Sequence, residues 1–111
     1  MSRPREKTRK KTRDGIGGEP LADVQLTALV NGYVQGVGFR WWTRSRALEL
    51  RLSGYATNLP DGRVQVVAQG PREKCQRLLD LLQCGNTPGA VDAVVADWSE
   101  ATEPINGFSA R

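Results

Sequence analysis

Apolar and polar residues alternate along residues 24–34, and a period of two predicts a β-strand with one buried face. A turn with two glycines follows at residues 35–38. Residues 39–50 contain no glycine or proline and favour a helix. This part of the chain is therefore predicted to be a strand, a tight turn and a helix. The apolar positions of the strand are Leu26, Ala28 and Val30.

Next, the pattern predicts a β-hairpin and a second helix. Two short apolar-rich stretches, residues 53–58 and 63–69, flank a turn at residues 58–62 that contains proline and glycine. Pro71 opens a helical pattern that Gly85 closes. The apolar stripe of this helix consists of Cys75, Leu78, Leu79, Leu81 and Leu82.

Alternation returns at residues 91–99, which predicts a further strand, and a last apolar element is expected at Phe108. The predicted order is β-α-β-β-α-β, the split βαβ arrangement. We therefore expect an α+β fold in which both helices pack on one face of an antiparallel sheet.

The composition, 39% hydrophobic and 25% charged over 111 residues, is that of one globular domain. Residues 1–20 have almost no large apolar side chains, so we expect a flexible basic tail ahead of a domain at residues 21–111. Seven basic and three acidic residues in this tail account for the whole net charge of +4. Neither an apolar run of about 18 residues nor a signal-peptide pattern is present, so we expect a cytoplasmic protein without a membrane partner.

The sequence contains no histidine and no Cys-x-x-Cys motif, which excludes the usual zinc sites and any mechanism with an imidazole base. Cys75 and Cys84 lie about 13 Å apart along the predicted helix. A disulfide allows roughly 7 Å between Cα atoms, so we expect both thiols to stay free. The chemistry is therefore expected to use no metal and no cofactor, only polar side chains, backbone amides and water.

The glycine turn at residues 35–38 places unpartnered backbone amides at the beginning of a helix, an arrangement that binds anions. Gly36 and Gly38 permit the tight turn and the close approach of a ligand. Arg40 adds a planar donor group suited to phosphate oxygens. The same turn also suits a plain connection beside a solvated arginine, and it lacks the P-loop and dinucleotide-binding motifs. From these residues alone both interpretations stay open.

Two longer segments resemble the signatures of the acylphosphatase family, in the family's order and at its spacing. The resemblance runs from about Leu26 to Phe108. The first segment is Gly32-Tyr33-Val34-Gln35-Gly36-Val37-Gly38-Phe39-Arg40. The second is Ala47-x-x-Leu50-x-Leu52-x-Gly54-Tyr55-x-x-Asn58-x-x-Asp61-Gly62-x-Val64.

The resemblance implies a ferredoxin-like fold and hydrolysis of the carboxyl–phosphate bond of small acylphosphates, without metal, cofactor or covalent intermediate. By position, Arg40 would hold the phosphoryl group together with the loop, and Asn58 would orient the attacking water. Inorganic phosphate or sulfate would compete for the same site, and we expect a monomer. The phosphate-binding loop implied in this way is Gln35, Gly36, Val37, Gly38, Phe39 and Arg40.

The sequence departs from the family pattern at several positions. Arg51 stands where many members carry a glycine at the end of the first helix, which suggests a strained or reshaped turn. The aromatic residue that commonly ends the family is missing, so a short final strand is expected. Trp41 and Trp42 are expected to fill the core between helices and sheet, or in one case to line the mouth of the site.

Two other functions compete with hydrolysis. One is a non-catalytic module that binds phosphate or carbamoyl phosphate in the same loop, as the acylphosphatase-like domain of larger hydrogenase maturation factors suggests. The other is weak RNA binding through the basic tail. RNA-recognition modules of this topology stack bases on aromatic residues of the central strands. Residues 63–69 contain none, so we expect no nucleic-acid partner for the domain.

Overall fold

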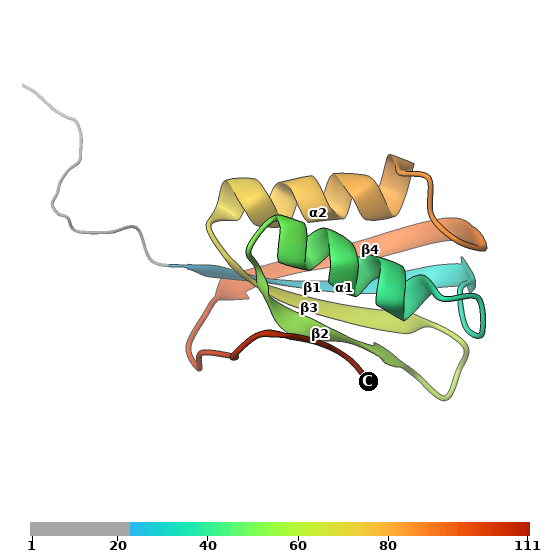
Figure 1. Cartoon of the computed structure of the whole chain (residues 1–111), viewed down its shortest axis with the longest axis horizontal. Coiled ribbons are helices and arrows are strands. Elements are labelled where there is room, and N and C mark those ends of the chain that lie inside the picture. Colours follow the sequence, from blue (N-terminus) through green and yellow to red (C-terminus); the bar gives the residue numbers. More distant parts are fainter. Residues whose placement is uncertain (1–22) are drawn as a thin grey trace, which may run out of the picture.

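The computed structural model describes residues 23–111, and its elements follow the order expected from the sequence pattern (Figure 1). The expected tail at residues 1–20 lies outside the described residues. The elements are β1 (Val24–Tyr33), α1 (Phe39–Glu49), β2 (Ser53–Asn58), β3 (Val64–Gly70), α2 (Arg72–Cys84), β4 (Ala90–Glu100) and β5 (Phe108–Ala110).

The described strands form one sheet in the order β4-β1-β3-β2-β5, which is the ferredoxin-like arrangement extended by β5 at one edge. Neighbours among the first four strands are antiparallel, as predicted. The last strand differs, because β5 pairs with β2 in parallel and extends the sheet beyond the antiparallel part. Both helices cover the same face of the sheet (Figure 1).

The alternation of β1 decides which residues form the core. Leu26, Ala28 and Val30 are fully buried, and their partners on β3 are also buried, so this face of the sheet lies under the helices. The stripe of α2 packs onto it through Cys75, Leu78, Leu79 and Leu82. The predicted core is therefore confirmed at these positions. The remaining buried apolar residues are Val34, Phe39, Ala47, Leu52, Ala56, Val64, Val66, Val67, Ala68 and Phe108.

The C-terminal end of α1 confirms that Arg51 occupies a position suited to glycine. Its φ is 60°, and among residues 23–111 Arg51 is the one residue other than glycine with a positive φ. The backbone N–H of Arg51 donates to Leu48 O (3.0 Å), and that of Leu52 donates to Ala47 O (2.9 Å). This pair of bonds is the Schellman ending of a helix. The turn keeps its usual shape, and the strain falls on one residue.

Within residues 23–111, no helix is both long and apolar enough to cross a bilayer.

Candidate functional site

The loop between β1 and α1 is built on two glycines in a left-handed conformation. Gly36 has φ of 77° and Gly38, which precedes the first residue of α1, has φ of 84°. A Cβ at either position would meet no other atom within 4 Å, so packing does not exclude one there. It is the backbone conformation that calls for glycine at both positions.

The other side chains of the loop are engaged by the surrounding fold. Phe39 is buried in the core, and Val37 packs against the core's edge. A Cβ at Gly89 would lie 2.0 Å from Tyr33 O and 2.9 Å from Val37 Cγ2, so the α2–β4 connection presses against this loop. What the loop leaves for a ligand is therefore its backbone.

The N-terminus of α1 offers backbone N–H groups and partial positive charge to an anion. Gly38 supplies no capping side chain, and the first turn contains no acidic residue. The first four N–H groups of a helix have no intrahelical partner, and the dipole adds partial positive charge there. Arg40 is the second residue of this turn. Two sources of positive potential thus coincide at one end of α1.

Arg40 reaches the edge of the sheet formed by β2 and β5. Its Nη1 donates to the main-chain oxygen of Arg111. The backbone N–H of Arg111 donates in turn to Ala56 O of β2 (2.7 Å). The guanidinium of Arg111 lies 3.8 Å from the centroid of the Tyr55 ring. Arg44, one turn further along α1, donates from Nε to Phe108 O (3.0 Å). The beginning of α1 is thus attached to the last strand.

Asn58 is the last residue of β2, exposed and paired across the hairpin with Val64. The turn that follows it is closed by two backbone bonds, Leu59 N–H to Arg63 O (2.8 Å) and Gly62 N–H to Leu59 O (3.1 Å). An ion pair between Asp61 and Arg63 (2.7 Å) lies at its tip. Hydrogen bonds from Arg63 hold the pKa of Asp61 below its usual value.

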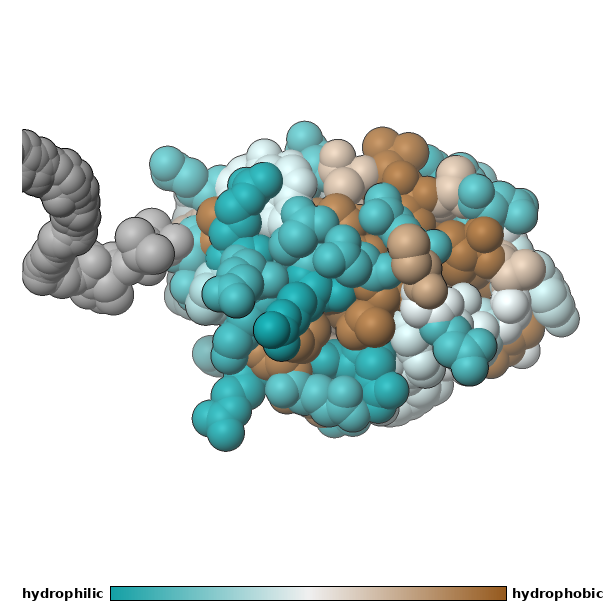
Figure 2. Space-filling model, turned by 90° about the horizontal axis from the view of Figure 1, so that it is seen from above, coloured by the Kyte–Doolittle hydropathy of each residue, from teal (hydrophilic) through white to brown (hydrophobic). Residues whose placement is uncertain are grey.

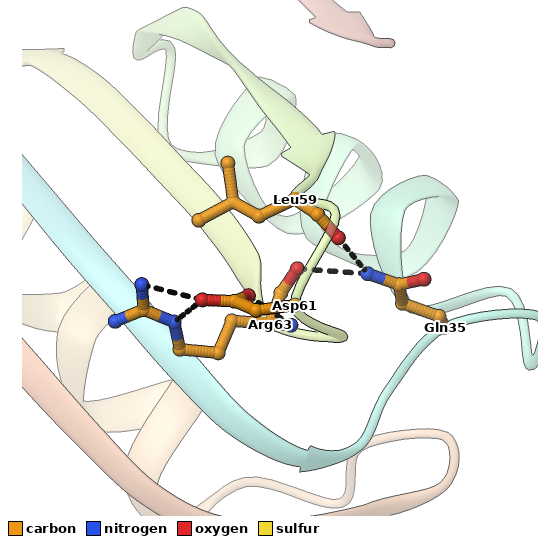
Figure 3. Close-up of polar contacts among 4 residues, drawn as sticks. All are labelled: Gln35, Leu59, Asp61 and Arg63. Carbon is orange, nitrogen blue, oxygen red and sulfur yellow. Dashed lines mark hydrogen bonds and ion pairs between the residues drawn. The ribbon is translucent and has the colours of Figure 1, made fainter.

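The structure brings the loop and the Asn58 turn together through the side chain of Gln35. Its Nε2 donates to Leu59 O (2.8 Å) and to Arg63 O (2.9 Å), as Figure 3 shows. The sequence placed Gln35 in the loop but indicated no role for its side chain. Its partners lie 24 and 28 residues away. A local pattern carries no signal for such contacts, nor for the bond between Arg40 and Arg111.

The two tryptophans that follow Arg40 behave differently. Trp42 packs against the core with its ring centroid 5.8 Å from that of Phe39, as expected. Trp41 is 58% exposed, and the guanidinium of Arg44 lies 5.8 Å from its ring centroid. The expectation that it fills the core is wrong, because helical spacing turns adjacent residues to different sides.

A hollow of about 440 Å³ lies between the residue that follows α1 and the second half of α2, lined by Leu50, Leu81, Cys84 and three further residues. On this side of the molecule, apolar and hydrophilic residues are interspersed (Figure 2). Leu50 follows Arg40 by ten positions, or about 15 Å along α1. None of the residues that line the hollow belongs to the loop at residues 35–40. Among residues 23–111, His, Cys, Asp and Glu side chains form no group of three that could hold a metal ion.

Comparisons with known proteins identify the family. The Acylphosphatase family model matches residues 26–110. A protein named acylphosphatase from Mycobacterium sp. (strain JLS) is 71% identical over 89 residues, which is 80% of this chain and 95% of the relative. One from Mycolicibacterium vanbaalenii is 70% identical over 90 residues, covering 81% and 97%.

A solved structure gives the same answer for the fold. The crystal structure of acylphosphatase from Bacillus subtilis superposes with a TM-score of 0.74 at 31% identity, over 79% of this chain and 98% of that one. The residues matched by the family model contain both the glycine loop and the hairpin that ends β2. The chain therefore belongs to the acylphosphatase family of enzymes.

Proposed function

We propose that this enzyme hydrolyses the carboxyl–phosphate bond of small acylphosphates to a carboxylate and inorganic phosphate. The observation that carries the proposal is the first turn of α1, which contains Arg40 but neither a capping side chain nor an acidic residue. Such a turn is suited to a dianionic phosphoryl group. Family membership adds the reaction class.

In this proposal the loop amides of residues 35–40 and Arg40 hold the phosphoryl oxygens. The bond to the Arg111 oxygen uses one of the five N–H donors of the guanidinium, so others remain for phosphate. Charge that develops on these oxygens in the transition state meets donors already in place. The side chains of the loop are held by the protein, which keeps its backbone ready for the ligand.

Asn58 orients the attacking water in the same proposal. Its Oδ1 accepts a hydrogen bond from the water, while its amide donates toward a phosphate oxygen. The water oxygen bonds to phosphorus as the bond between phosphorus and the carboxylate oxygen breaks. The electron pair leaves with the carboxylate, and both water protons stay on the dihydrogen phosphate product. A carboxylate departs without a general acid, so positioning and charge stabilisation supply the acceleration.

The test is turnover of benzoyl phosphate by the purified chain in the presence of a chelator. We expect hydrolysis well above the spontaneous rate, with competitive inhibition by inorganic phosphate or sulfate. Phosphate binding without turnover would instead establish a non-catalytic module, and no turnover at all would refute the hydrolase.

Asn58→Ala separates water positioning from ligand binding. We expect a lower kcat with nearly unchanged inhibition by phosphate, because the lost amide acts mainly in the transition state. Asn31→Ala, at an exposed asparagine of β1, is the matched control. A large rise in the inhibition constant with kcat preserved would make Asn58 a binding residue.

A further inference from the structure

The side chain of Gln35 joins the two halves of the proposed site. Its two donor bonds of 2.8 and 2.9 Å end on the carbonyl oxygens of Leu59 and Arg63, and it is half-buried between them. Both partners are acceptors only, which fixes the amide with its NH₂ group toward the turn. Figure 3 shows Gln35 directed from the β1–α1 loop at the hairpin.

These two carbonyls are the ones that define the turn after Asn58. Arg63 O already accepts from Leu59 N–H, and Leu59 O accepts from Gly62 N–H. Leu59 is the residue directly after Asn58, so its Cα lies 3.8 Å from that of Asn58. The amide of Gln35 therefore holds the peptide next to the proposed water-orienting residue.

The other end of Gln35 is equally restrained. Val34, the residue before it, is buried in the core, and Gly36 after it has the positive φ that shapes the loop. Both N–H groups of the side chain are used on the turn. Of Gln35, only the backbone N–H is then available to a phosphate.

We propose that Gln35 is a positioning residue that acts through Asn58, by setting the separation between the phosphate held in the loop and the water held at the hairpin. The inference rests on the proposed function. Attack on phosphorus needs the incoming and leaving oxygens roughly in line, so the rate depends on this separation. Phosphate affinity depends on it much less, since the loop amides and Arg40 supply most of the contacts to the ligand and Asn58 supplies one.

The first experiment compares Gln35→Leu with the unsubstituted chain in benzoyl phosphate hydrolysis. We expect kcat to fall about tenfold or more, since small misplacements of reacting groups cost this much or more in rate. The inhibition constant of inorganic phosphate should change by less than about threefold, because loop amides and Arg40 are retained. Gln65→Leu, on the face of the sheet away from the helices, is the matched control and should leave both values unchanged.

The second experiment asks whether the effect passes through Asn58. In the Asn58→Ala background, Gln35→Leu should reduce kcat by less than about threefold. The asparagine side chain that Gln35 would position is already removed there, so the two losses should not add. A full additional loss would mean that Gln35 acts elsewhere, and would overturn the inference. A rise of the phosphate inhibition constant in step with the loss of kcat would also overturn it, by making the side chain a phosphate ligand.

Two results distinguish a failure of the inference from a failure of the proposed function and from a general loss of stability. An active unsubstituted chain with an equally active Gln35→Leu variant refutes the inference alone, whereas an inactive unsubstituted chain refutes both. Urea unfolding of each variant measures general destabilisation. A Gln35→Leu chain that is folded in the assay and still binds phosphate, but turns over slowly, supports the inference.

Discussion

Arg40 occupies a place where the helix dipole disfavours a positive charge. It is the second residue of α1, and no acidic side chain of that turn compensates it. Its guanidinium already donates to the main-chain oxygen of Arg111. A planar group with five donors has enough left for two phosphate oxygens, whereas an ammonium with three would have to divide them between strand and ligand.

We therefore predict that Arg40→Lys lowers kcat/KM for benzoyl phosphate by about a hundredfold or more, the loss typical of a removed transition-state donor. Steady-state kinetics measure it. Arg44→Lys is the control, because Arg44 bonds to Phe108 of β5 from the same helix but is not assigned to the ligand. Equal losses in the two variants would point to damage at β5 instead of a phosphate contact.

At the scale of the element, the ends and faces of the helices decide where the fold carries strain. The Schellman ending of α1 has the hydrogen bonds of a regular helix stop, yet the residue at its left-handed position is Arg51. A left-handed backbone costs a residue with a side chain about 1–2 kcal/mol. Glycine avoids this cost, but it loses more conformational entropy on folding, which costs about 0.5–1 kcal/mol.

Arg51→Gly should accordingly raise the free energy of unfolding by about 0.5–1 kcal/mol. Urea denaturation followed by circular dichroism measures the change. Arg51→Ala removes the same side chain but keeps the strain, so it should leave stability nearly unchanged. If alanine stabilised the protein as much as glycine, the side chain and not the backbone would be the cause.

On α2, the two cysteines have opposite surroundings. Cys75 is fully buried in the core, whereas Cys84 is exposed, and both are free thiols. Burial raises the pKa of Cys75 from 9.0 to about 11, with a smaller contribution in the same direction from Asp23. The folded protein therefore keeps this proton at a pH where the unfolded chain releases it.

The sign of this difference predicts a loss of stability in alkali. The contribution of the Cys75 thiol is fully present below pH 9 and is lost as pH rises from 9 to about 11. Thermal unfolding across this range should show a smaller decline for Cys75→Ala than for the unsubstituted chain. Cys84→Ala should decline like the unsubstituted chain. Parallel curves for all three proteins would contradict the assignment.

At the scale of the whole molecule, the sequence predicted those features that depend on neighbours in the chain. The alternation at Leu26, Ala28 and Val30 identified the buried face of β1, and the stripe of α2 identified the partner layer. The glycines at 36 and 38 marked the left-handed turn before α1. Each of these features repeats with the period of its own element, so a local pattern is sufficient to find it.

Contacts between distant segments could not be predicted in this way. The parallel pairing of β5 involves three residues, too few for a period, and it depends on the edge that β2 presents. The bonds of Gln35 to the hairpin depend on how β1 and β3 lie side by side. The assignments of Arg40 and Asn58 rest on resemblance and remain proposals, because spacing along a chain does not give the distance between side chains.

The bond from Arg40 to Arg111, the residue directly after the last strand, can form only at the end of the synthesis of this sequence. The oxygen that accepts the bond from Arg40 belongs to a residue 71 positions later in the chain. The pairing of Val24 with Glu100 spans even more of the chain, so the strands at both edges of the sheet are completed only by its C-terminal part. A ribosome would thus release the glycine loop and both helices well before the arginine has its anchor. The last strand also carries Phe108 of the core, so the core and the bond of Arg40 are completed together when β5 docks.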